Sequence, residues 1–281
     1  MREQNIATKL IRASELIQQA DGLIIAAGAG IGIDSGLPDF RGDHGFWREY
    51  PKFAKLSMRF SDVASPNTFD VFPEIAWGFY GHRLQLYRET VPHQGFQILL
   101  KLAKRMPSGA FVFTSNVDGQ FQKAGFDADR IIECHGSIHY LQCTIPCCDD
   151  IWSAEKFVPK VKLEECRLVN AAPLCIHCGA LARPNILMFD DIQWIARRSA
   201  EQGDQKHTWL QRMQRPVVLE IGAGKAISTA RDFSKWVVQK QRGHRIRINP
   251  DDYTVGREQD VGIELGAQEA IYFLKNYFFK K

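Results

Sequence analysis

The chain has 281 residues, of which 45% are hydrophobic and 24% charged, and a formal net charge of +4 at pH 7. This length allows one large domain or two unequal ones, and the mild charge gives no argument for a specific nucleic-acid partner. Since the sequence contains neither the roughly 18-residue apolar run that spans a bilayer nor a signal-peptide core, we expect a cytoplasmic protein with no membrane partner.

Expected helices and strands alternate along most of the chain. Apolar residues at helical spacing predict a helix over residues 5–20, and a buried strand follows at 23–27. The pattern then predicts a helix at 94–105, strands at 110–114 and 217–221, a helix at 227–240 and a strand at 245–248. This alternation indicates an α/β fold with a mostly parallel sheet that is covered on both faces.

Each expected strand ends in small or polar residues. The four strand ends run into Gly28-Ala29-Gly30, Ser115-Asn116-Val117-Asp118, Gly222-Ala223-Gly224 and Asn249-Pro250. Because open α/β sheets bind ligands outside the carboxyl ends of their strands, these residues are expected to line one crevice. Asn and Asp after a strand also commonly form a turn with their own backbone, so a structural role stays open for the second group.

The first of these loops has the composition of a phosphate-binding loop. Glycines there allow positive φ and a close approach of backbone N–H groups to a phosphate. The dinucleotide fingerprint G-x-G-x-x-G is only half met, because Ile33 occupies the third glycine position. A glycine-rich loop without a ligand is the alternative. Asp39, Phe40 and Arg41 follow, and together they could hold a ribose, a flat heterocycle and a phosphate.

His135 is a candidate general base. It follows a short strand-like run, Ile131-Ile132, and precedes Gly136, which would allow a ligand to come close. An imidazole titrates near neutral pH and is suited to proton abstraction. A single histidine is nevertheless more often structural than catalytic.

Six of the seven cysteines lie within residues 143–180. Cys143 and Cys147 form one pair, and Cys175 and Cys178 form a second pair after a loop, which is the pattern of a structural zinc site with four thiolates. Cys148 could replace Cys147 at this spacing. Residues 43–93 are aromatic-rich with a helical pattern. We expect 43–93 and 143–180 to form a smaller domain, and 1–42, 94–142 and 181–281 to form the domain that holds the sheet.

Several motifs together resemble the sirtuins, which are NAD-dependent protein deacylases. GAGIGIDSGLPDFRG at residues 28–42, TSNVDGQFQKAG at 114–125 and CHGS at 134–137 are similar to the family's motifs and occur in the same order, followed by the two cysteine pairs. The resemblance implies a Rossmann-like domain with a smaller zinc-binding and helical domain. It also implies that NAD is consumed, that one structural zinc is bound, and that the partner is an acylated-lysine protein or peptide.

The resemblance further implies a mechanism and roles for residues. Nicotinamide leaves the ribose, the acyl oxygen attacks the freed carbon, and His135 acts as general base on a ribose hydroxyl, with Asn116 and Asp118 as the other catalytic residues. Deacylated lysine, nicotinamide and O-acyl-ADP-ribose would be the products. The residues implied to contact NAD are Gly28, Ala29, Gly30, Ile31, Asp39, Phe40, Arg41, Ser115, Asn116, Asp118, Gly222, Ala223, Gly224, Asn249 and Ala267.

Tyr80 and Arg83 resemble the Tyr-x-x-Arg pair of sirtuins that remove succinyl or malonyl groups. At positions i and i+3 the two side chains share one face of a helix, and an arginine can bind a carboxylate bidentately. An ordinary amphipathic helix is the alternative interpretation.

The sequence also departs from the family pattern. Ser115 replaces a glutamine, Ala223 and Gly224 replace a Thr-Ser pair, and Asp190 stands where the family has a glycine beside its peptide-binding edge. An NAD glycohydrolase or ADP-ribosyltransferase on the same fold is therefore a rival, and a non-catalytic NAD sensor is another.

Overall fold

The computed structural model describes residues 2–38 and 42–278. Its main sheet has six parallel strands in the order β11-β10-β9-β1-β2-β3. The strands are β1 (Gly22–Ala27), β2 (Ala110–Thr114), β3 (Ile131–Glu133), β9 (Pro216–Ile221), β10 (His244–Ile248) and β11 (Val261–Ile263). Read from β3 to β11, this is the Rossmann order, in which the direction of winding reverses between β1 and β9.

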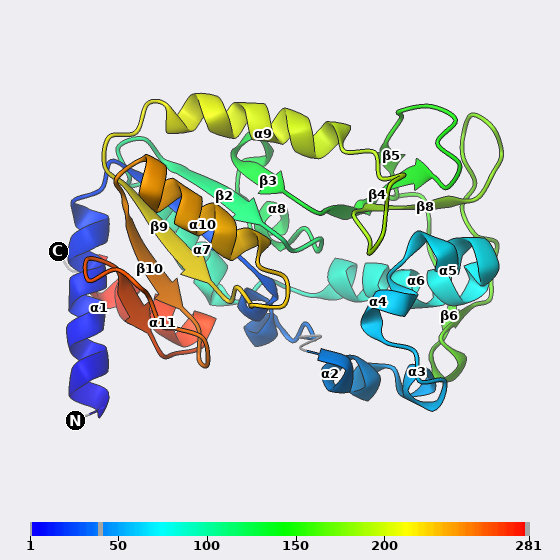
Figure 1. Ribbon diagram of the computed structural model, residues 1–281, viewed down its shortest axis with the longest axis horizontal. Coiled ribbons are helices and arrows are strands. Elements are labelled where there is room, and N and C mark those ends of the chain that lie inside the picture. The colour runs from blue at the N-terminus through cyan, green and yellow to red at the C-terminus, as the bar shows by residue number, and fades with distance from the viewer. Residues whose placement is uncertain (1, 39–41, 279–281) are drawn as a thin grey trace.

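Helices cover both faces of this sheet (Figure 1). One core lies under α1 (Arg2–Gln18), α7 (Gln94–Ala103) and α11 (Ala267–Phe278), and another lies under α9 (Arg197–Leu210) and α10 (Thr229–Lys240). Every residue of β1 and β9 is buried. Alternate β1 residues therefore enter opposite cores, with Ile25 in the first and Ile24 in the second.

A second lobe lies beside the sheet and has its own core (Figure 1). Its helices are α2 (Gly42–Glu49), α3 (Pro51–Lys55), α4 (Phe60–Val63), α5 (Pro66–Val71) and α6 (Pro73–Glu89). Its strands are β4 (Gly136–Cys143), β5 (Trp152–Ser153), β6 (Val161–Lys162), β7 (Arg167–Leu168) and β8 (Ala182–Ile186). They form an antiparallel sheet in the order β5-β4-β8 and a β6-β7 pair. Stacked and edge-on rings, such as Phe46 against Phe53 and Phe79, fill the core.

The remaining elements are short: α8 (Gln120–Lys123) and the 3₁₀ turns η1 (Ala29–Ile31), η2 (Ile33–Ser35), η3 (Ala128–Arg130) and η4 (Leu163–Glu165). The predicted helices and strands of the sheet domain are present, and their ends differ from prediction by a few residues. No helix among the described residues has the length and apolar character needed to span a membrane. The α/β fold with a parallel sheet is thus confirmed.

Candidate functional site

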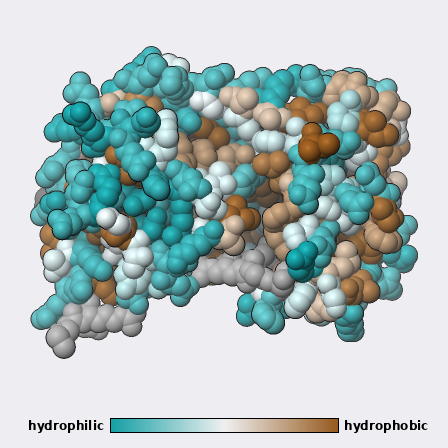
Figure 2. All heavy atoms as spheres, viewed as in Figure 1, coloured by the Kyte–Doolittle hydropathy of each residue, from teal (hydrophilic) through white to brown (hydrophobic). Residues whose placement is uncertain are grey.

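A cavity opens where the strand order reverses. It has a volume of about 380 Å³ and lies between the carboxyl ends of the sheet strands and the second lobe. Figure 2 shows hydrophobic residues in a recess between the two parts of the molecule. Of the sequence-predicted residues, the following line the cavity: Gly28, Ala29, Gly30, Tyr80, Arg83, Ser115, Asn116, Asp118, His135, Gly222 and Gly224.

The glycines after β1 and β9 allow two loops to pack backbone against backbone. The amide of Gly28 donates to the Ile221 carbonyl and that of Gly30 to the Gly222 carbonyl, each at 3.0 Å. A Cβ atom on Gly30 would lie 2.7 Å from Gly222 Cα, and Gly222 itself has φ +60°. The close approach of the two loops therefore requires glycine, whether or not the loops also contact a phosphate.

The base candidate, His135, lies just after β3 at the cavity wall. Its Nε2 atom is 3.1 Å from the hydroxyl of Thr229, the first residue of α10. Burial lowers the pKa of His135, and a hydrogen bond with the Ser115 backbone opposes this shift. The imidazole is therefore neutral at physiological pH, which is the state that a general base needs.

Asn116 and Asp118 follow β2 and face the same space. The Asn116 amide donates to the Gly28 carbonyl at 3.1 Å and so connects the loops after β1 and β2. Asp118 is 8% exposed, and burial raises the pKa of its carboxyl to about 6. Its Oδ1 accepts a hydrogen bond from the Gln120 amide at 2.9 Å, which fixes the side chain.

Tyr80 and Arg83 reach the cavity from α6. Both are buried, and the Arg83 guanidinium lies among the rings of Phe79, Tyr80 and Tyr87, with centroid distances of 5.1, 5.8 and 5.3 Å. The Tyr87 hydroxyl accepts from Arg83 Nε at 3.0 Å and from Nη2 at 2.6 Å. Tyr87, one helical turn beyond Arg83, was missed by the sequence analysis although the i, i+4 spacing was visible.

Among the described residues, four other predicted NAD contacts do not line this cavity: Ile31, Ala223, Asn249 and Ala267. Ile31 is fully buried in the core, and Ala267 is buried at the start of α11. The Asn249 amide donates to the Ala223 carbonyl at 3.2 Å, and its oxygen accepts from the amides of Asp251 and Asp252. Asp39, Phe40 and Arg41 lie outside the described residues.

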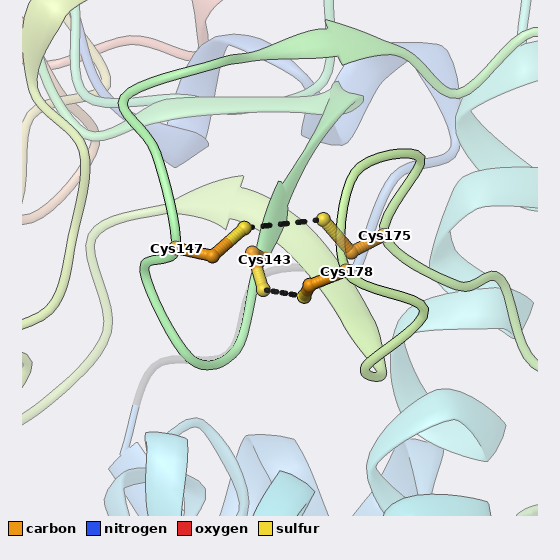
Figure 3. A group of neighbouring side chains, drawn as sticks. All are labelled: Cys143, Cys147, Cys175 and Cys178. Carbon is orange, nitrogen blue, oxygen red and sulfur yellow. Dashed lines mark hydrogen bonds between the residues drawn. The ribbon is translucent and has the colours of Figure 1, made fainter.

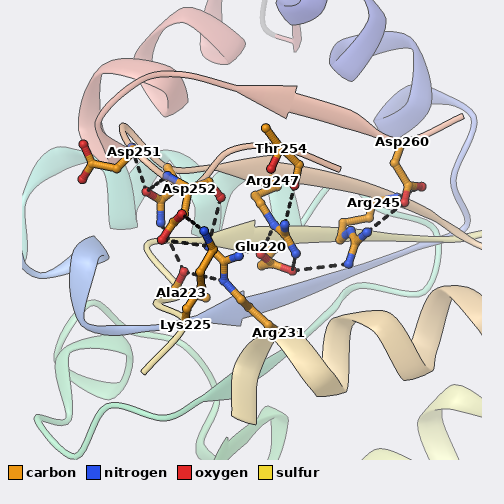
Figure 4. A network of polar contacts seen from close by, with 11 residues as sticks. Glu220, Ala223, Lys225, Arg231, Arg245, Arg247, Asp251, Asp252, Thr254 and Asp260 are labelled. Carbon is orange, nitrogen blue, oxygen red and sulfur yellow. Dashed lines mark hydrogen bonds and ion pairs between the residues drawn. The ribbon is translucent and has the colours of Figure 1, made fainter. Parts of the chain in front are cut away.

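Beside the loops after β1 and β9, a polar network joins β9 to β10 (Figure 4). Arg247 binds the Glu220 carboxylate, Arg245 contacts Asp260 at 3.3 Å, and Arg231 Nε donates to the Ala223 carbonyl at 2.9 Å. These buried charges were not foreseen as a network. Pairing is what permits their burial, and it holds the ends of the two strands in register.

Asp190, which departs from the family pattern, has a left-handed backbone with φ +55°. That conformation favours glycine, and aspartate tolerates it better than most residues. The next residue, Asp191, forms a bidentate ion pair with the buried Arg183 at 2.7 and 2.8 Å. This pair ties β8 to the segment 187–191, part of which lines the cavity.

Four cysteines converge where the chain that leaves β4 meets the loop that precedes β8 (Figure 3). Cys143 and Cys178 have sulfurs 3.6 Å apart, and those of Cys147 and Cys175 are 3.7 Å apart. A tetrahedron with zinc–sulfur bonds of about 2.3 Å has edges of about 3.8 Å, so the four thiols fit one structural zinc ion. Cys147, and not Cys148, belongs to this cluster.

Comparisons with known proteins agree with this geometry. The model of the Sir2 family matches residues 28–210. Two similar proteins are NAD-dependent protein deacylases: one from Aquifex aeolicus, 24% identical over 92% of this chain and 96% of its own, and one from Thermococcus sibiricus, 29% identical over 93% of each. A crystal structure of a Sir2 homolog–NAD complex has a TM-score of 0.70 at 23% identity, covering 95% of this chain and 93% of its own.

Proposed function

The chain belongs to the Sir2 family, and on that premise we propose that it is an NAD-dependent deacylase of lysine side chains in proteins. One observation carries the proposal: the neutral imidazole of His135, the glycine loops after β1 and β9, and the Tyr80–Arg83 face of α6 meet in a single cavity. A base, a nucleotide-type loop and a pocket that could hold an acyl group are thus within reach of one another.

The residues of the chain divide the chemistry between them. When bound, NAD supplies an activated ribose whose nicotinamide is the leaving group. The loops at 28–30 and 222–224 would hold the dinucleotide, with Asn116 and Asp118 on the nicotinamide side. His135 would take a proton at Nε2 from a ribose hydroxyl, a task for which its pKa, lowered by burial, keeps it unprotonated.

We further propose that the acyl group is acidic. The Arg83 guanidinium lies at the cavity wall in an aromatic surround, where water competes weakly for a carboxylate. Its partner Tyr87 is a neutral hydroxyl, so the charge of the guanidinium is not cancelled by that contact. A succinyl- or malonyl-type carboxylate would complement it.

The function is tested by incubating the protein with NAD and either acetyl- or succinyl-lysine peptide and measuring nicotinamide and O-acyl-ADP-ribose. Peptide-dependent formation of both products is expected, and His135→Ala should abolish it with little change in NAD affinity. Nicotinamide release that is independent of the peptide would instead identify an NAD glycohydrolase. Absence of any nicotinamide release would mean that the protein binds NAD without catalysing a reaction.

A further inference from the structure

A second group of metal-ligand side chains lies beside the four-cysteine cluster. Cys148, Asp150 and His177 each offer one sulfur, oxygen or nitrogen atom, and these atoms lie within 4.8 Å of one another. They come from the same two loops that hold the first cluster. None of the three lines the cavity that contains His135.

Thiolate, imidazole and carboxylate are the three donor types that zinc takes in proteins. Tetrahedral zinc with bonds of about 2.0–2.3 Å separates its ligand atoms by about 3.3–3.8 Å. His177 Nε2 and Asp150 Oδ2 are now 2.6 Å apart and share a hydrogen bond. Both side chains are about half exposed, at 43% and 47%, so they can separate by less than 1 Å without disturbing a packed core.

Charge also favours a second cation at this place. Four thiolates around one zinc ion carry a net charge of −2, and the sulfur of Cys148 lies only 3.8 Å from that of Cys147. The Asp150 carboxylate adds a further negative charge, which Arg197 faces at 3.8 Å. Thiolates and a carboxylate that lie close together repel one another, and a divalent ion between them would remove that repulsion.

We propose that Cys148, Asp150 and His177 form a second zinc site, with water or the neighbouring Cys147 sulfur as fourth ligand. The ion would join the loop 144–151 to the loop 174–179 at a second point. Its role would be structural, since the site is separate from the cavity in which the proposed deacylation takes place. A surface ion pair between Asp150 and His177 with no metal is the competing explanation.

Metal content of the full-length protein tests the proposal. The protein is equilibrated with about 10 µM free zinc, dialysed against metal-free buffer and analysed by plasma mass spectrometry, with circular dichroism as a check on folding. Two zinc ions per chain are expected. Cys148→Ser and His177→Ala should each retain one ion, whereas Cys166→Ser, which alters a buried cysteine outside both groups, should retain two.

Three results would overturn the proposal. One zinc ion in the unaltered protein means that the pair Asp150–His177 binds no metal. Two ions in both variants mean that the second ion lies elsewhere. Loss of all zinc from a folded Cys148→Ser variant means that Cys148 is a ligand of the one zinc ion that the protein binds, and that there is no second site. Cobalt(II) provides a second readout, because the thiolate-to-cobalt absorption per chain should fall in the Cys148→Ser variant and stay constant in the Cys166→Ser variant.

Discussion

Arg83 is the residue on which the proposed acyl preference depends. Replacing it in Arg83→Met keeps much of the apolar stem and removes the charge. A charge-assisted hydrogen bond to a buried carboxylate contributes about 1.5–3 kcal/mol, so kcat/KM for a succinyl-lysine peptide should fall by roughly 10- to 100-fold. For an acetyl-lysine peptide it should change by less than about threefold. Initial rates on the two peptides at fixed NAD concentration provide the measurement.

The hydroxyl of Tyr87 offers a finer variant of the same experiment. Tyr87→Phe leaves the ring and removes the acceptor for Arg83 Nε and Nη2, so it should reduce desuccinylation less than Arg83→Met does. Arg59→Met, on an exposed arginine, serves as a control. Equal losses on acetyl and succinyl peptides would assign Arg83 a purely structural role among its three rings.

At the scale of elements, the loops after β1 and β9 make a close backbone contact in the site. In Gly30→Ala the new Cβ would meet Gly222 Cα at 2.7 Å and its carbonyl oxygen at 2.9 Å, and these are backbone atoms that cannot rotate away. The loops must separate, so we expect a loss of about 2 kcal/mol in the free energy of unfolding and weaker NAD binding. Urea unfolding and calorimetric titration with NAD measure the two effects.

Gly203→Ala is the matched control for that prediction. Gly203 lies inside α9, and apart from the backbone of that helix and the two neighbouring residues, a Cβ there would have no described atom within 4 Å. Alanine has the higher helix propensity, so this variant should be as stable as the unaltered protein or more stable by up to about 1 kcal/mol. Similar stability of Gly30→Ala and Gly203→Ala would mean that the loops after β1 and β9 accommodate a side chain.

The elements that could be predicted from the sequence are those with a strong local signal. The strands at 23–27, 110–114 and 217–221 are mostly apolar runs, interrupted only by Thr114 and Glu220, as is typical of strands buried on both faces. Helix α9 was not predicted, since charged and polar residues fill most of its surface and only Trp209 and Leu210 are buried. The burial of Arg245 and Arg247 likewise depends on Glu220 and Asp260, which are distant in sequence.

The site also divides into residues with a local sequence signal and residues that depend on distant contacts. Residues in the loops just after a strand, such as Gly28, Asn116 and Gly222, were predicted because strand ends meet at one edge of a parallel sheet. Thr229 contacts His135 across the fold, and no sequence motif records that contact. Tyr87 lies one turn from Arg83 on the same helix, and its spacing was visible although no motif includes it. The choice of Cys147 over Cys148 also needed the path of the loop, because adjacent cysteines satisfy the same spacing.

For the whole molecule, burial of ionisable groups gives stability two opposing dependences on pH. Burial lowers the pKa values of four histidines, His82, His93, His135 and His139. The unfolded chain therefore binds more protons than the folded protein. The contribution of these histidines to the stability of the fold is complete above the ordinary imidazole pKa, and it is lost as the pH falls through their lower pKa values in the folded protein. Asp118 has the opposite effect, because burial raises its pKa to about 6 and the folded state binds the extra proton.

The Asp118 contribution can be isolated with Asp118→Asn. In the unaltered protein the buried carboxyl must ionise as pH rises from its ordinary pKa of 3.8 through about 6, so this group makes the fold less stable over that interval. Asparagine does not ionise and can still accept the bond from the Gln120 amide. Relative to the unaltered protein, Asp118→Asn should therefore gain about 2 kcal/mol of unfolding free energy between roughly pH 4.5 and pH 7. Urea unfolding at both pH values measures this difference, with Asp129→Asn, at an exposed position, as the control. A difference that stays constant with pH would show that the Asp118 carboxyl ionises as readily in the folded protein as in the unfolded chain.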